Sequence, residues 1–113
     1  MAAHITIHPA EGTWVVRADG AVIAESRNAL ELTEGSYPPV IYFPPGDVAM
    51  AFLEPSDRVT HCPHKGDTVY YHIAAAGGAI ADAAWCYATP LPGVAPIAGH
   101  LAFDPNLVTV ERL

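Results

Sequence analysis

Short apolar segments separated by turn-forming residues run along the whole chain. The 113 residues include 11 prolines and 9 glycines, and most of the prolines stand between these segments. Proline has no backbone N–H to donate, so it ends helices and is excluded from the inner strands of a sheet. The segments are rich in β-branched and aromatic residues, and none shows a helical period over a helix length. We therefore expect about nine short strands in an all-β, mainly antiparallel domain with little helix.

A first hairpin is predicted near the N-terminus. Residues 13–18 alternate, and Asp19-Gly20 then supplies two positions of positive φ, which is typical of a type I′ turn. Residues 21–26 are expected to return as the partner strand, and residues 1–12 to form an arm or a short edge strand. Further strands, the last two forming a closing hairpin, are expected at residues 29–34, 40–43, 48–53, 101–103 and 107–110.

A second hairpin occupies the middle of the chain. A two-residue turn at residues 77–78 would pair Tyr70 with Trp85 and Tyr71 with Ala84. Because successive side chains of a strand point to opposite faces, one face is aromatic with polar tips and the other is mainly aliphatic. The aromatic face carries Thr68, Tyr70, His72, Ala83, Trp85 and Tyr87. The aliphatic face carries Val69, Tyr71, Ile73, Ala75, Ile80, Asp82, Ala84 and Cys86.

The aromatic face has two interpretations. Tyrosine, tryptophan and histidine offer flat apolar area together with groups that form hydrogen bonds, so this face can line a ligand-binding cleft. Large aromatic residues also fill protein cores, so Trp85 and Tyr70 can instead be a cross-strand core pair. The sequence leaves both interpretations open.

Charge and cysteine content limit the classes of partner. Twelve acidic and 5 basic side chains give a net charge of −7, which opposes binding to nucleic acid and to anionic membranes. The sequence has neither a secretory signal pattern nor a run of about 20 apolar residues. Cys62 and Cys86 are expected to be reduced thiols. We expect a single domain over residues 1–113 in the cytoplasm, with no nucleic-acid or membrane partner.

Several short motifs follow one another in a characteristic order. They are Tyr42-Phe43-Pro44 followed by Asp47-Val48, Thr60-x-Cys62-Pro63-x-Lys65-Gly66, Tyr70-Tyr71, Ala84-Trp85-x-Tyr87 and Ala102-Phe103. In these motifs the chain resembles a small bacterial family called domain of unknown function 427, which family catalogues label nucleotidyltransferase-like. The resemblance covers nearly the whole chain, from the hairpin at Trp14 to the last strand.

The resemblance implies a β-tent fold, in which two antiparallel sheets meet at a steep angle, as in the thalidomide-binding domain of cereblon. Those relatives bind zinc through two Cys-x-x-Cys pairs and hold their ligand in an aromatic cage. This sequence contains no Cys-x-x-Cys pair, so that zinc site is not carried over. The resemblance transfers no catalytic residue, and the cage is an analogy at the level of the fold.

Reactive side chains gather in residues 60–66, which we expect to form a short loop leading into the second hairpin. Cys62 is accompanied by His61, His64 and Lys65, and basic neighbours of this kind favour the nucleophilic thiolate. An enzyme would use Cys62 or His61 as nucleophile or base and Lys65 to stabilise an anion. The alternative is a buried, inert cysteine at the end of a strand.

The same segment contains metal-ligand types in an unusual arrangement. His61, Cys62 and His64 are suitable ligands, and His72 or His100 could complete a tetrahedral set. Zinc usually takes its ligands as spaced pairs, whereas these three form one compact cluster. No metal site and no cofactor are therefore predicted.

Three functions follow from these observations, and we rank a binding module first. It would hold a small polar or anionic molecule against the aromatic face, through Arg58, His64, Tyr70, His72, Trp85 and Tyr87. The second function is an enzyme built on Cys62, His61 and Lys65, with nucleotidyl transfer as the activity that the family label suggests. No Walker motif and no spaced aspartate pair for magnesium supports that label. The third is a domain that assembles with itself, as a homo-oligomer, or with a partner through the apolar sheet face.

Overall fold

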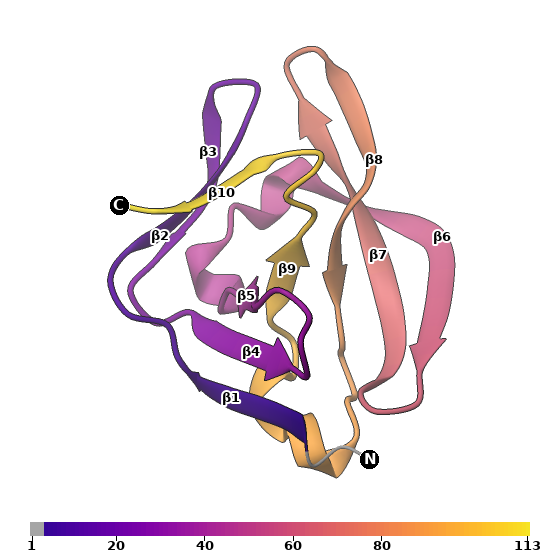
Figure 1. Ribbon diagram of the computed structural model, residues 1–113. Coiled ribbons are helices and arrows are strands. Elements are labelled where there is room, and N and C mark those ends of the chain that lie inside the picture. Colours follow the sequence, from indigo (N-terminus) through magenta and orange to yellow (C-terminus); the bar gives the residue numbers. More distant parts are fainter. Residues whose placement is uncertain (1–3) are drawn as a thin grey trace.

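A computed structural model describes residues 4–113, which form antiparallel sheets and three short 3-10 helices (Figure 1). The strands are β1 (Ile5–Pro9), β2 (Trp14–Ala18), β3 (Ala21–Ser26), β4 (Leu30–Glu34), β5 (Val40–Tyr42), β6 (Leu53–Cys62), β7 (Gly66–Ala75), β8 (Gly78–Cys86), β9 (Leu101–Phe103) and β10 (Thr109–Arg112). The helices are η2 (Pro45–Asp47), η3 (Met50–Phe52) and η4 (Pro92–Ile97). The prediction of an all-β, mainly antiparallel domain with little helix is confirmed.

The strands form three sheets, with the orders β1-β4-β5, β10-β2-β3 and β6-β7-β8-β9. The first and third sheets are joined where Phe43 and Leu101 exchange two backbone hydrogen bonds of 2.8 and 2.9 Å. This contact stays a single bridge because Pro44 follows Phe43 and has no N–H for a ladder. The resemblance implied two sheets, and the structure has three, two of which meet at this bridge. Figure 1 shows the long hairpin of β7 and β8, with β6, on one side and β2, β3 and β10 on the other.

The predicted N-terminal hairpin is confirmed. Strands β2 and β3 pair antiparallel, and the residues between them, Asp19 and Gly20, have φ values of 49° and 80°. Strand β1 lies at the edge of its sheet, as expected for the start of the chain, although residues 1–3 of that prediction lie outside the described residues. Strands β4 and β5 also follow their predictions to within a residue at each end.

Two predictions between Val48 and Gly66 are wrong. Residues 48–53 were expected as a strand, but Val48 makes only an isolated bridge and the chain then turns through η3, where alanine and methionine favour helical geometry. The segment 60–66 was expected as a loop, but β6 continues through Pro55 to Cys62. This strand tolerates proline because it is the edge strand of its sheet and has a bulge between Pro55 and Val59.

The prediction of a closing hairpin is also wrong, because its two strands belong to different sheets. Strand β9 pairs with β8, whereas β10 pairs with β2. A turn after Phe103, in which Leu107 N–H donates to the Asp104 carbonyl at 3.0 Å, carries the chain from one sheet to the other. The C-terminal strand therefore connects the sheets, which a pattern of local turns does not predict.

The pairing of β7 with β8 agrees with the prediction at the site but not at the turn. The structure pairs Ala75 with Gly78, so the two turn residues are 76 and 77, one position earlier than the predicted 77–78. A bulge then sets residues 81–83 opposite His72 alone, and beyond it Tyr70 pairs with Trp85 and Tyr71 with Ala84, as predicted. The bulge thus restores the predicted register on the side of the hairpin that carries the aromatic residues.

The aliphatic face of this hairpin lies in the main hydrophobic core. Ile73, Ala84 and Cys86 are buried there with Phe43, whose ring packs edge-to-face on Phe103 at 5.7 Å. A smaller cluster around η4 includes Tyr42 and Tyr87. The aliphatic face is covered by the rest of the main core, so it is not free to bind a second copy of the chain. Oligomerisation through another surface stays a prediction.

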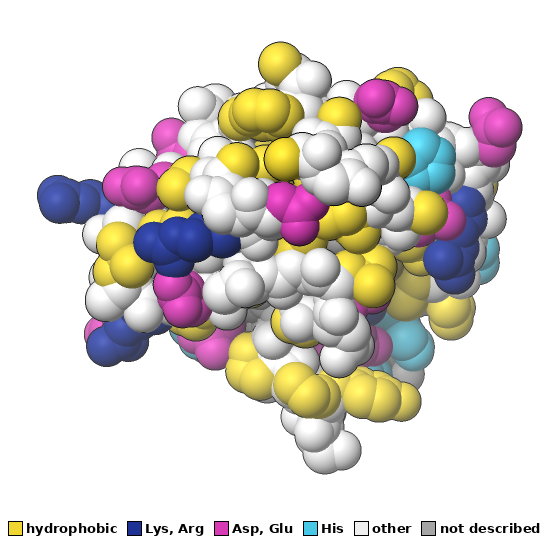
Figure 2. Space-filling model, turned by 90° about the horizontal axis from the view of Figure 1, so that it is seen from above, with side chains coloured by type: hydrophobic (Ala, Val, Ile, Leu, Met, Phe, Trp, Pro, Cys, Tyr) yellow, Lys and Arg dark blue, Asp and Glu magenta, His cyan; other side chains and the backbone are white. Residues whose placement is uncertain are grey.

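The surface seen from above is mixed in character. Lysine and arginine side chains stand apart from one another on this face, and acidic and apolar groups lie between them (Figure 2). Among the described residues, no helix is long and apolar enough to cross a membrane.

Candidate functional site

A cleft of about 380 Å³ lies where the sheet of β4 and β5 faces the sheet of β6, β7 and β8. The first sheet contributes Glu34 and Tyr42, and the connection between its strands contributes Tyr37. The other sheet lines the cleft with Arg58, Thr60, Cys62, Thr68, Tyr70, Asp82 and Trp85, while Lys65 and Tyr87 follow directly from its strands. The site is therefore assembled from segments far apart in the chain.

The aromatic face of the β7–β8 hairpin forms one wall of this cleft. Tyr70 and Trp85 are cross-strand partners and both are partly exposed, whereas Tyr87 is buried at the inner end. The indole N–H of Trp85 donates to the hydroxyl of Tyr42 on the facing sheet at 3.4 Å. Features of both interpretations of this face are present, because Tyr70, Trp85 and Tyr87 line the cleft while Tyr87 and Trp85 also belong to the smaller core cluster.

The two buried phenols of the cleft are neutral hydrogen-bonding groups. Burial raises the pKa of Tyr42 and also raises the pKa of Tyr87. Both hydroxyls therefore keep their protons near neutral pH. Because Tyr42 uses its oxygen as an acceptor for Trp85, its own proton is available to a ligand.

An ion pair closes the end of the cleft near the β6–β7 turn. Lys65 Nζ lies 2.7 Å from Glu34 Oε1, and the side chains are 12 % and 18 % exposed. The hydrogen bond from Lys65 lowers the pKa of Glu34, and the ammonium also lies 6.0 Å above the ring of Tyr87. Burial is the largest single effect and lowers the pKa of Lys65, but the hydrogen bond to Glu34 and the Coulombic effects of Tyr87, Cys62 and Glu34 together outweigh it, so the net pKa is raised. Both groups are therefore charged at neutral pH.

A second cation, Arg58, lies over the aromatic wall. Its guanidinium carbon is 4.5 Å from the ring centre of Tyr70, a cation–π geometry. The hydroxyl of Tyr70 is held at 3.0 Å from Thr60 on the neighbouring strand. Arg58 is 54 % exposed and its nearest acidic partner, Asp82, is 4.0 Å away. Its N–H donors are therefore less committed than those of Lys65.

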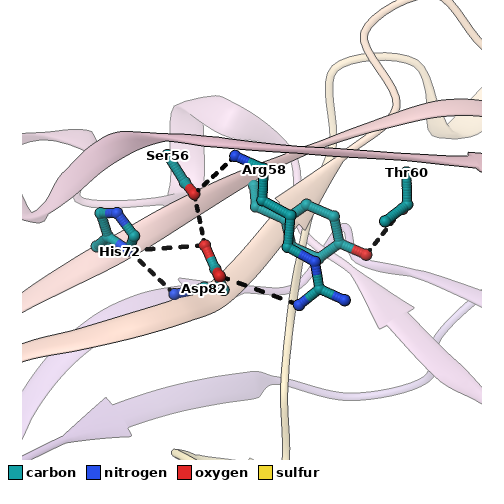
Figure 3. A network of polar contacts seen from close by, with 6 residues as sticks. Ser56, Arg58, Thr60, His72 and Asp82 are labelled. Atoms are coloured by element: carbon teal, nitrogen blue, oxygen red, sulfur yellow. Dashed lines mark hydrogen bonds and ion pairs between the residues drawn. The ribbon is translucent and has the colours of Figure 1, made fainter.

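Asp82 connects this wall to the bulge in β8 (Figure 3). Its backbone has a φ of 52°, and its N–H donates to His72 Nδ1 at 3.1 Å. Its carboxylate accepts from the hydroxyl of Ser56, which in turn accepts from the backbone N–H of Arg58 at 3.1 Å. The bulge thus turns Asp82 from the aliphatic face, where the sequence placed it, toward Arg58 and the cleft.

Replacing Asp82 with alanine is expected to lower the free energy of unfolding by about 2 kcal/mol. The change combines a left-handed backbone that alanine adopts at a cost with the loss of the hydrogen bond from Ser56. Asp82→Gly removes only the side-chain part, and Asp57→Ala is the exposed control in the same sheet. Urea unfolding of the three variants measures both parts. An Asp82→Ala protein as stable as Asp57→Ala would contradict this role.

The structure brings together six of the predicted site residues and separates three. Around the cleft lie Arg58, Cys62, Lys65, Tyr70, Trp85 and Tyr87. His61 instead lies outside it, with Nδ1 2.8 Å from the exposed carboxylate of Asp67. Because β6 runs through Cys62, its neighbour His61 points to the opposite face of the strand and does not reach the thiol.

The other two predicted histidines also lie outside the cleft. His64 is in the β6–β7 turn, where its ring meets that of His4 edge-to-face at 5.4 Å. His72 is directed at the bulge and accepts from Asp82. The prediction for His72 assumed a regular hairpin, and the bulge in β8 changes its surroundings. The prediction for His64 assumed an open loop, whereas the longer β6 leaves His64 in a tight turn.

The sequence did not identify several residues that line the cleft. Glu34 pairs with Lys65, 31 positions later, and only the packing of the sheets brings them together. Tyr37 and Tyr42 come from the same facing sheet and its connection. The motif Tyr42-Phe43-Pro44 was the one available signal for Tyr42, and the tolerance of aspartate for positive φ was a weak one for Asp82.

Comparison with known proteins identifies the family of the chain. A family model described as Domain of unknown function (DUF427) matches residues 6–113, which is nearly the whole chain. No curated protein matches the sequence.

Proposed function

We propose that this chain, which belongs to the family described as domain of unknown function (DUF427), binds a small planar molecule that carries an anionic group. The observation that carries this proposal is the guanidinium of Arg58 over Tyr70 at the wall of the cleft. The arrangement places a donor-rich cation beside flat aromatic surface. A ligand with a ring and an acidic group would use both features at once.

Shape and composition of the cleft favour a planar ligand. Its volume of about 380 Å³ is within the range of small-molecule pockets. Trp85 offers ring surface beside the stacked pair of Arg58 and Tyr70, and Tyr42 offers a protonated hydroxyl for an acceptor. Many different planar ligands can stack on aromatic rings, so the polar groups of the cleft, rather than the rings, would determine which ligand binds.

Arg58 is a better anion-binding group than Lys65. The ammonium of Lys65 is already hydrogen bonded to Glu34 at 2.7 Å and is mostly covered. Arg58 is half exposed, and the carboxylate of its distant partner Asp82 is also engaged by Ser56. An incoming carboxylate or phosphate could therefore accept two parallel hydrogen bonds from Arg58 without displacing a short ion pair.

An enzyme remains the second candidate, because Cys62 and Lys65 share the cleft. The family's label, NTP_transf_9, names nucleotidyl transfer. That reaction would need at least two carboxylates placed to hold magnesium together, whereas in residues 4–113 the one cluster of three ligand-type side chains contains a single carboxylate, Glu34. His61 would also have to reach the cleft from the opposite face of β6. These features favour binding over transfer.

A cytoplasmic location and a small-molecule partner complete the proposal. Cys62 and Cys86 are free thiols, which fit a reducing compartment such as the bacterial cytoplasm. The net charge of −7 disfavours nucleic acid and anionic membranes as partners.

Arg58→Gln is expected to weaken binding of an anionic ligand by about 10- to 100-fold, because a charge-assisted hydrogen bond is lost. Native mass spectrometry of freshly purified, tag-free protein first reveals any retained molecule. Tryptophan fluorescence is then titrated with two matched pairs, cytidine 5′-monophosphate against cytidine and benzoate against benzamide. The wild type should prefer the anionic member, and Arg58→Gln should lose that preference.

Arg27→Gln is the matched control, since Arg27 is exposed in the β3–β4 connection and does not line the cleft. It should bind the anionic probes as the wild type does. Equal affinities of the two arginine variants would contradict the role of Arg58. The proposal as a whole would be contradicted by a protein that retains no molecule and shows no saturable binding of either anionic probe.

A further inference from the structure

We propose that His4, Glu34 and His64 form a binding site for a divalent transition-metal ion, with zinc as the best fit. One ligand atom from each side chain lies within 4.8 Å of the other two. The site differs from the cluster of neighbouring residues that the sequence suggested, since it shares only His64 with it. It also stands beyond the proposed function, because His4 and His64 lie outside the cleft.

The separations are close to those of a bound ion. In a tetrahedral zinc site with bonds of about 2.0–2.1 Å, ligand atoms stand about 3.4 Å apart. His4 Nε2 is 3.6 Å from Glu34 Oε2, so this pair is already in place. The rings of His4 and His64 meet edge-to-face with their centres 5.4 Å apart. A small rotation of the His64 side chain would therefore complete the set.

Three separate segments hold the ligands. His4 directly precedes β1, whose first residue, Ile5, pairs with Glu34 at the end of β4. The backbone is fixed further by Gly35, whose N–H donates to the His4 carbonyl at 3.2 Å. His64 comes from the tight turn between β6 and β7. These contacts put the ligands on backbone that is already positioned by sheet pairing, which lowers the entropy lost on binding.

The two carboxylate oxygens of Glu34 face two different side chains. Oε1 accepts from Lys65 at 2.7 Å, while Oε2 faces His4. A ligating carboxylate is commonly held by such a hydrogen bond on its other oxygen, and the bond fixes its orientation. Lys65 would thus act as a positioning residue for the metal ligand and as part of the cleft wall at the same time.

The chemistry of the donors selects the metal. Two imidazoles and one carboxylate are a ligand set of zinc sites that keep an open fourth position for water. Calcium and magnesium prefer sites made of oxygen alone, so two histidines disfavour them. Copper would bind such donors at least as tightly as zinc, because the affinity of nitrogen and oxygen donors for divalent first-row metals is highest for copper. The donors therefore indicate a divalent transition metal as the class of ion, and zinc is the ion used in the test.

The test is a calorimetric titration of metal-stripped, tag-free protein with zinc chloride. The wild type should bind one equivalent of zinc, and His4→Ala and His64→Ala should each lower the affinity at least about tenfold. Removing a group that only supports a ligand already lowers metal affinity by about 10- to 100-fold, so removing a ligand itself should cost at least as much. Cobalt should give the visible absorption of a tetrahedral nitrogen and oxygen site in the wild type and lose it in both variants. Circular dichroism of each variant checks that it is folded.

His8→Ala is the matched control. His8 is in β1, four residues after His4, and faces Glu31 at 3.6 Å, as His4 faces Glu34, but within residues 4–113 no third ligand-type side chain joins that pair. It should bind zinc as the wild type does. The proposal would be overturned if the wild type showed no saturable binding at one equivalent, or if His4→Ala and His64→Ala bound zinc as tightly as His8→Ala.

The metal site and the ligand cleft can fail separately. Arg58→Gln should bind zinc normally, and His4→Ala should bind the anionic probes of the cleft normally. Arg58 is not one of the three ligands, so loss of zinc binding in Arg58→Gln would overturn the metal site as assigned.

Discussion

Replacing Phe43 with alanine is expected to lower the free energy of unfolding by about 4 kcal/mol, the cost of truncating a fully buried aromatic residue. Phe43 lies where two sheets meet, between the end of β5 and Leu101. Its ring packs on Phe103 in the main core, and alanine would leave a cavity bordered by both sheets. Urea unfolding followed by tryptophan fluorescence and circular dichroism measures the loss.

Phe52→Ala is the matched control for this prediction. Phe52 is in η3 and is 40 % exposed, so the same truncation there should cost less than about 1 kcal/mol. The backbone bridge of Phe43 to Leu101 does not depend on the side chain and is retained in the variant. A Phe43→Ala protein no less stable than Phe52→Ala would show that the junction of the sheets does not depend on this ring.

Replacing Trp85 with alanine is expected to reduce binding in the cleft by at least about 100-fold, as truncation of a central aromatic contact does. Trp85 supplies a large part of the aromatic wall, and its N–H holds the hydroxyl of Tyr42. The same change should cost about 3 kcal/mol of stability, because Trp85 also packs on the smaller core cluster. Titration with benzoate and cytidine 5′-monophosphate, by calorimetry, measures the loss of binding.

Two variants separate loss of the wall from general damage. Trp14→Ala removes the other of the two tryptophans, in a different sheet, and should leave the affinity for both probes unchanged. Trp85→Phe keeps a ring and a folded core but removes the bond to Tyr42, so it should bind with intermediate affinity. Cys62→Ser should bind normally, since the proposed contacts do not include the thiol. Circular dichroism should show that Trp85→Phe is folded. If Trp85→Ala then binds the probes as tightly as Trp14→Ala does, the assignment of this wall is contradicted.

Local patterns predicted the elements whose determinants lie close together in the chain. The Asp19-Gly20 turn and its strands follow from two residues of positive φ flanked by alternating segments. The aromatic wall of Tyr70 and Trp85 was also predicted, although the predicted turn was wrong. The bulge opposite His72 compensates for the different turn, so the pairing was correct for a reason that the sequence does not contain.

The errors share a physical cause. An edge strand accepts proline because its outer N–H groups need no partner, and only the sheet order shows that β6 is at an edge. The same misplaced loop led to the expectation that His61, Cys62 and His64 act together, whereas alternation along β6 separates His61 from the thiol. In each case the local sequence was compatible with two backbones, and contacts from elsewhere in the chain selected one.

Alternation and turn chemistry act over a few residues, so the fold class, most strand positions and the aromatic character of one hairpin face follow from local sequence. Which groups meet that face depends instead on how the sheets pack. Glu34 reaches Lys65, and Tyr42 reaches Trp85, because the two sheets pack against each other. Likewise His4 comes beside His64 through the pairing of β1 with β4 and the placement of the β6–β7 turn. Such pairs form because segments far apart in the chain pack together, and no local sequence pattern predicts that packing.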